Sequence, residues 1–110
     1  MPHGLYIAEF ENVLLKHSFA ISRNSLSQLI AEVDFSGLDN ISEADRHALY
    51  ETLVDCIKPR GRGIENGLQI LGEDDSRDIV TGMKDRAAQR LISPSRVRDI
   101  WCKIFIGGCP

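Results

Sequence analysis

The sequence predicts an all-α protein, a compact bundle of about five or six short helices. Two observations lead to this prediction. Apolar residues recur every three or four positions along most of the chain, and residues typical of helix starts and stops separate these stretches. With 110 residues, of which 43% are hydrophobic and 26% charged, the chain has the length and composition of one folded domain, which we expect to cover residues 1–110.

The first helix is predicted between Leu5 and His17, where one side carries an apolar stripe and the other is polar. A second helix is predicted to begin at Ser25. Ser25 and Gln28 have the spacing of a capping box, and an apolar stripe follows them. We expect Gly37 to end this helix.

A third helix is predicted after Ser42, which has Asp45 three residues later and so resembles an N-cap. Pro59 must stop this helix, because proline lacks a backbone N–H and its ring clashes with the preceding turn. The segment Lys58–Gly63 is expected to be a flexible basic loop.

The stretch from Ile64 to Leu71 is ambiguous. Its apolar residues have helical spacing, whereas the pair Asn66 and Gly67 is typical of a hairpin turn. We predict a short helix, because no alternating strand pattern flanks the pair and an isolated hairpin is only marginally stable.

Acidic residues follow Gly72, where negative charge interacts favourably with a helix N-terminus. They predict a helix whose apolar stripe runs to Leu91, and Gly82 is expected to kink this helix or divide it in two. The last helix is predicted over Pro94–Phe105, with Ser93 as its N-cap and the proline at its first position.

Charge is unevenly distributed along the chain. The net charge is -3, but residues 1–55 hold three Lys or Arg against nine Asp or Glu, and residues 56–110 hold ten against seven. Within 84–103, six cations face only two carboxylates. Such a basic surface favours a phosphate backbone or an acidic partner, although an ordinary solvated helix face has the same composition.

Two short helices, Lys84–Leu91 and Pro94–Phe105, are predicted to be joined only by Ile92 and Ser93, a spacing close to that of a helix-turn-helix. If the apolar side of the second helix packs inward, its polar side is free to enter a major groove. Arginine there can donate two hydrogen bonds to guanine, while other cations contact phosphates. The predicted DNA-binding residues are Arg86, Arg90, Ser95, Arg96, Arg98 and Lys103.

The segment Met83–Trp101 resembles the helix-turn-helix of small bacterial and phage proteins. In that pattern an A-A-x-R-L stretch, a glycine-containing turn, Ser, Arg and a closing I-W follow in order. The matching residues here are Ala87, Ala88, Arg90, Leu91, Ser93, Arg96, Ile100 and Trp101. The similarity covers about a sixth of the chain, and the glycine that usually follows the leucine is absent. The resemblance implies a small non-enzymatic bacterial regulator that binds DNA.

A second interpretation remains open, in which the arginines are merely solvated and the chain binds another protein. Its first three predicted helices are acidic outside, and a core of this size can leave an apolar face for a partner. Inhibitors of this kind include antiactivators of transcription factors and toxin-immunity proteins. On either interpretation we expect a homodimer, because one recognition helix alone makes few specific contacts and the core is modest.

Several other classes of protein are not indicated. The histidines are far apart, and no Cys or carboxylate lies at metal-ligand spacing, so we predict no metal, no cofactor and no enzymatic activity. Cys56, Cys102 and Cys109 are an odd set without C-x-x-C spacing, and we expect reduced thiols. No apolar run approaches the length of a membrane span, so a cytoplasmic location is expected.

Overall fold

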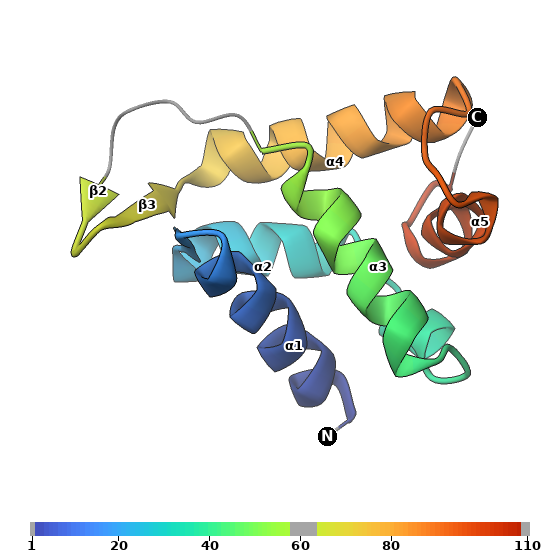
Figure 1. Cartoon of the computed structure of the whole chain (residues 1–110), viewed down its shortest axis with the longest axis horizontal. Coiled ribbons are helices and arrows are strands. Elements are labelled where there is room, and N and C mark those ends of the chain that lie inside the picture. The colour runs from blue at the N-terminus through green and yellow to red at the C-terminus, as the bar shows by residue number, and fades with distance from the viewer. Residues whose placement is uncertain (1, 58–63, 109–110) are drawn as a thin grey trace.

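The computed structural model describes residues 2–57 and 64–108, so the predicted loop Lys58–Gly63 lies outside the described residues. Figure 1 shows the arrangement of the elements. They follow in the order α1 (Pro2–Lys16), β1 (Phe19–Ile21), α2 (Arg23–Ala31), the 3-10 helix η1 (Phe35–Leu38), α3 (Glu43–Val54), β2 (Ile64–Glu65), β3 (Leu68–Leu71), α4 (Glu73–Ala88) and α5 (Ser95–Ile104).

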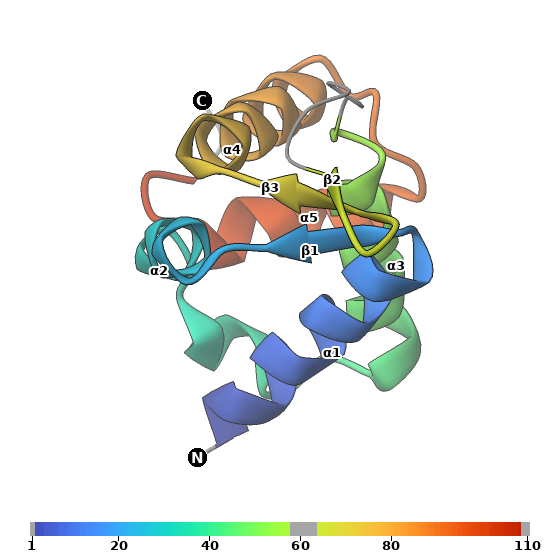
Figure 2. The same ribbon diagram turned by 90° about the vertical axis from the view of Figure 1, so that its left-hand side faces the viewer.

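A small mixed sheet lies at one end of the molecule, so the fold is mixed α/β and the all-α prediction is wrong. The strand order is β1-β3-β2. Strand β3 lies in the middle. It pairs with β1 in parallel, with Ala20 opposite Ile70, and it pairs with β2 in antiparallel orientation. Figure 2 shows the sheet with α1 below β1, and with α2 and α4 following the two parallel strands.

The short helix predicted over Ile64–Leu71 is therefore also wrong, because this segment forms the hairpin of β2 and β3. Asn66 and Gly67 have φ angles of 53° and 77°, both in the left-handed region that a two-residue hairpin turn requires. The hairpin is not isolated. β1 supplies a third strand and Leu71 is completely buried, so the turn residues outweigh the helical spacing of the apolar side chains.

The three helices predicted in the first half are present, but several of their boundaries differ. Helix α1 begins at Pro2 rather than Leu5, and α2 ends at Ala31, so Gly37, which was predicted to end it, lies in η1 instead. Helix α1 ends at Lys16, one residue before the predicted limit, and the Ser42 hydroxyl accepts a hydrogen bond from the Asp45 N–H at 3.2 Å at the start of α3. Helix α2, however, is capped by Ser22, whose hydroxyl accepts from the N–H of Ser25 at 3.3 Å. The predicted cap at Ser25 lies inside the helix, where its side chain is fully buried.

Helix α4 is one continuous helix that ends at Ala88, so Lys84–Leu91 is not a separate short helix. Arg90 has a φ of 61°. Two hydrogen bonds close this end in a Schellman motif: the Arg90 N–H donates to Ala87 at 3.1 Å and the Leu91 N–H to Arg86 at 2.8 Å. A left-handed residue at this point ends the helix, although it is not glycine.

The link between α4 and α5 is longer than predicted. It contains six residues, Gln89–Pro94, rather than Ile92 and Ser93 alone. Pro94 is the N-cap of α5 and Ser95 its first helical residue, so the predicted boundary is wrong by one position. Helix α5 packs against η1, α3 and α4, and the rings of Trp101 and Phe105 stack with centroids 3.4 Å apart.

The cysteines differ in state. Cys56 is a buried free thiol, as predicted. Cys102 is disulfide-bonded, so the prediction of reduced thiols is wrong for this residue. Cys109 lies outside the described residues. Among the described residues, no helix combines the length and the hydropathy that a bilayer-spanning segment requires.

Candidate functional site

Helix α5 presents one polar side to solvent. Val97 and Trp101 are completely buried and Ile104 is nearly so, which confirms that the apolar side of this helix packs inward. The exposed side consists of Ser95, Arg96, Asp99 and Lys103, with Arg98 half-buried at its margin. The polar side of this helix is therefore open to solvent, as the sequence predicted.

Carboxylates offset part of the positive charge on this face. Arg96 Nε donates to Asp45 Oδ1 of α3 at 2.7 Å, and Arg98 Nη2 lies 3.9 Å from Asp99 Oδ1. Ion pairs of exposed groups are weak, but each lowers the positive potential that a phosphate would meet. The α5 face is therefore a mixed surface rather than a uniformly basic one.

The remaining predicted DNA-binding residues lie outside α5. Arg86 is half-buried on α4, where its Nη1 donates to Cys56 Sγ at 3.0 Å. Burial raises the pKa of the Cys56 thiol, and the nearby Arg86 charge opposes this shift. Arg90 is exposed at the end of α4. Arg86 therefore joins α4 to the segment that follows α3.

An almost wholly apolar hollow opens between α1, α2 and η1. We call it the core hollow. It has a volume of about 40 Å³ and reaches buried side chains of α3 and α5 such as Leu49 and Ile104. The lining residues that remain half-exposed, and so form its mouth, are Ile7, Leu26, Ile30, Val33 and Phe35.

A second hollow lies further along α1, between that helix and β1. We call it the strand hollow. It has a volume of about 170 Å³ and is lined by Glu11, Leu14, Leu15, Phe19, Ala20 and Ile21. Leu15 is 50% exposed there. Ile7 and Leu14 are seven residues apart on α1 and so lie at nearly the same angle, about 10 Å apart along its axis, whereas Tyr6 and Leu15 lie on opposite sides of the helix; the two hollows therefore lie on adjoining sides of α1.

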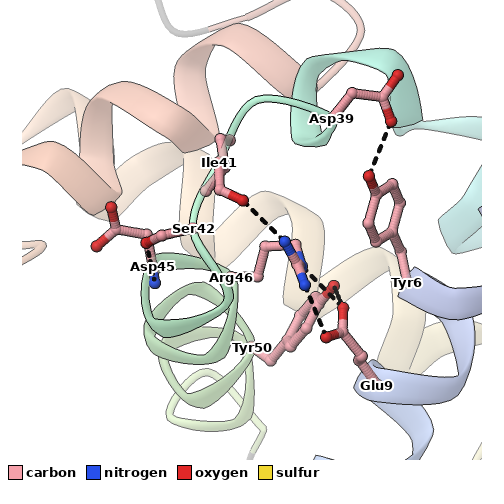
Figure 3. A network of polar contacts seen from close by, with 8 residues as sticks. All are labelled: Tyr6, Glu9, Asp39, Ile41, Ser42, Asp45, Arg46 and Tyr50. Atoms are coloured by element: carbon pink, nitrogen blue, oxygen red, sulfur yellow. Dashed lines mark hydrogen bonds and ion pairs between the residues drawn. The ribbon is translucent and has the colours of Figure 1, made fainter.

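A polar network holds α1, one wall of both hollows, against α3 (Figure 3). Arg46 donates from Nε to Glu9 Oε1 at 2.9 Å and from Nη2 to Glu9 Oε2 at 3.0 Å. Its Nη1 donates to the Ile41 carbonyl at 2.8 Å, and the Tyr50 hydroxyl donates to Glu9 at 3.2 Å. The hydrogen bonds from Arg46 lower the pKa of the Glu9 carboxyl, and burial raises the pKa of Tyr50.

The same network reaches the segment between η1 and α3. The Tyr6 hydroxyl donates to Asp39 Oδ1 at 2.8 Å, and this bond raises the pKa of the tyrosine. The Arg46 guanidinium also lies 5.2 Å from the centre of the Tyr6 ring. Because Tyr6 lines the core hollow, these contacts fix the shape of its wall.

Two further hollows are more polar. One, of about 470 Å³ between α2 and α4, is lined by Glu32, Arg77 and Lys84 among others. The other, of about 370 Å³, contains Cys56 and Arg86 beside three aspartates. No group of three or more His, Cys, Asp or Glu side chains within residues 2–57 and 64–108 is suited to hold a metal ion.

Comparisons with known protein families, with curated proteins and with solved structures found no match for this chain.

Sequence reasoning missed both hollows, because it assigned the apolar residues of α1 to a single stripe. That stripe accounts for Tyr6 and Phe10, which are buried. Leu5, Ile7 and Leu15 lie off the stripe. The side chains of Leu5 and Leu15 are 57% and 50% exposed. An amphipathic helix with large apolar residues on more than one side was the signal available in the sequence.

Proposed function

We propose that this chain is a non-enzymatic protein-binding regulator, which holds a segment of another protein along α1, where the core hollow and the strand hollow lie on adjoining sides. One observation carries the proposal: an almost wholly apolar hollow opens from the core to the surface, with a second hollow beside it on the same helix. The strand hollow, at about 170 Å³, has room for one large apolar side chain, and the core hollow, at about 40 Å³, only for the tip of one. Apolar side chains seated in such hollows anchor protein complexes.

The test selects peptides from a displayed random library against the whole chain and maps the enriched peptides by chemical-shift changes. Leu15→Glu should weaken their binding about tenfold or more, because it places a charge in the strand hollow. Leu91→Glu is the matched control, since Leu91 is also exposed, at 66%, but lines neither hollow. Equal loss in both variants, or shifts confined to α5, would contradict the proposal.

DNA binding is a second candidate, favoured by the exposure of Arg90, Ser95, Arg96 and Lys103. On this hypothesis Arg96→Ala weakens sequence-specific binding by roughly 1 to 3 kcal/mol if it contacts a guanine, while Lys103→Ala mainly lowers the salt dependence. A mobility shift with the gene's own upstream DNA at two salt concentrations separates the candidates. Full activity of a chain with Arg86, Arg90, Arg96 and Arg98 all changed to alanine would count against DNA binding.

A further inference from the structure

The polar hollow of about 470 Å³ between α2 and α4 has a contact between the two helices at each end, and we call it the interhelix hollow. Figures 1 and 2 show α2 and α4 side by side. At one end the Ser76 hydroxyl donates to the Ser25 carbonyl at 3.0 Å, and at the other Lys84 Nζ lies 3.9 Å from Glu32 Oε2. These contacts are seven residues apart at α2 and eight at α4, so the hollow extends about 10 to 12 Å along both helices.

The floor of the interhelix hollow is apolar and its rim is polar. Leu29 and Val80 line it with buried side chains. Gln28, Arg77 and Thr81 line it as exposed residues and carry an amide, a guanidinium and a hydroxyl group. Sites for small molecules have volumes of this size and combine an apolar lining with a few polar groups that fix orientation. The hollow therefore suits a small molecule that has an apolar body and one polar end.

The charge of the interhelix hollow indicates the sign of that polar end. Two cations, Arg77 and Lys84, and one carboxylate, Glu32, line the hollow and leave a net charge of +1. Lys84 lies beside Glu32, and its Nζ also donates to the Ile106 carbonyl at 3.2 Å. None of the ion pairs within residues 2–57 and 64–108 includes Arg77. An anionic group would therefore meet an unneutralised guanidinium, which can donate two parallel hydrogen bonds to a carboxylate.

The other polar hollow, which also borders α4, has the opposite charge. Its charged lining residues are Asp75, Asp78, Asp85 and Arg86, with a net formal charge of -2. A hollow of negative charge disfavours the entry of an anion. Of these two polar hollows, the interhelix hollow is thus the one that favours a negatively charged ligand.

We propose that the interhelix hollow binds a small monocarboxylic acid, with its carboxylate at Arg77 and its aliphatic body on Leu29 and Val80. One carboxylate matches the net charge of the hollow, whereas the additional charge of a phosphate monoester would be repelled by Glu32. Leu29 is the one described residue that lines both this hollow and the core hollow. The ligand site is therefore distinct from the protein-binding surface along α1 and adds a second kind of ligand to the proposed function.

The first test titrates hexanoate into the whole chain and follows the backbone amide chemical shifts. We expect shifts at Gln28, Arg77 and Thr81. Hexanamide lacks the charge and acetate lacks the aliphatic body, so each should bind about fivefold more weakly or worse. Equal binding of hexanoate and either analogue would overturn the proposal, as would hexanoate shifts confined to Ile7 and Val33 at the mouth of the core hollow.

The role of Arg77 is tested with Arg77→Gln, which should weaken hexanoate about fivefold or more and leave hexanamide nearly unchanged. Arg90→Gln is the matched control, because Arg90 is also exposed but lines neither polar hollow. Arg77→Lys keeps the charge and should lose less affinity than Arg77→Gln. Equal losses in Arg77→Gln and Arg90→Gln, or in the two Arg77 variants, would contradict recognition of the carboxylate by this charge.

The preference for a single negative charge is tested at Glu32. Glu32→Gln removes the one carboxylate of the hollow and should strengthen hexanoate about threefold, and hexyl phosphate by more. Glu65→Gln, at an exposed residue of β2 outside the hollow, should change neither affinity. Tighter binding of hexyl phosphate than of hexanoate to the unchanged protein would show that the ligand class is wrong.

Discussion

Glu9 and Arg46 form a bidentate ion pair in which the side chains are only 16% and 13% exposed. We expect Glu9→Gln to lower the free energy of unfolding at neutral pH by about 2 to 4 kcal/mol, because the mostly buried guanidinium loses its counter-charge. Urea unfolding followed by the fluorescence of Trp101, the single tryptophan of the chain, measures this change. A loss no larger than that of Glu11→Gln, the control on the same helix, would contradict the prediction.

The stabilisation by Glu9 should also depend on pH. The folded-state pKa of Glu9 lies below its usual value of 4.5, chiefly through the Arg46 hydrogen bonds. The stabilisation is therefore complete above the unfolded pKa and is lost as the pH falls through the lower, folded pKa. Unfolding free energies between about pH 5 and pH 2 should fall more steeply for the natural chain than for Glu9→Gln. Parallel curves would show that Glu9 does not contribute.

Arg90 occupies the left-handed position that ends α4, with a φ of 61°. Glycine adopts this conformation without strain, so Arg90→Gly should raise the free energy of unfolding by about 0.5 to 1 kcal/mol. Ala88→Gly, two residues earlier and within the helix, should lower it by a similar amount. Thermal unfolding of the two variants distinguishes the effects. A loss of stability in both variants would exclude a left-handed backbone conformation at Arg90.

Gly67 is the corresponding position in the β2–β3 hairpin, where its φ of 77° disfavours any side chain. Gly67→Ala should destabilise the protein by about 1 kcal/mol, whereas Asn66→Gly, at a φ of 53°, should be neutral or slightly stabilising. Chemical denaturation of both variants is the measurement. An unchanged Gly67→Ala protein would favour the helix that the apolar spacing had indicated.

The elements predicted from sequence were those with a local signal. Helix α3 is specified by its Ser42 cap and its apolar stripe, and both lie within a few residues of each other. Strand β1 has only three residues, too few to show alternation, and its partner residues lie about fifty positions away in β3. Because that pairing is not local, no window of the sequence contains it.

The candidate site was predictable only in part, for a similar reason. The outward side of α5 follows from the period of Val97, Trp101 and Ile104, and the structure confirms it. The acidic neighbour of Arg96 comes from α3, fifty-one residues earlier, which charge counting along the chain cannot detect. The core hollow combines residues of four α-helices and of η1, so only the packed structure reveals it.

The stability of the whole molecule depends on β3, because this strand joins the sheet to the helical core. The connection is made by Leu71, whose side chain is completely buried. Leu71→Ala should lower the free energy of unfolding by about 2 to 5 kcal/mol, because its cavity lies between the parallel strands and the helices. Unfolding followed by far-ultraviolet circular dichroism and by Trp101 fluorescence should coincide in this variant, since one core unites both parts. Two separated transitions would show that the sheet and the helices unfold independently.

The pairing of β1 with β3 also has a consequence for biosynthesis. While the ribosome is still translating the middle of the chain, β1 has already emerged with both of its sides unsatisfied, and it must wait for residues 68–71. Trp101, which fills the interior, emerges later still. The nascent polypeptide therefore cannot complete its native structure until late in synthesis, and an early-emerging strand in this condition is a natural client for a chaperone.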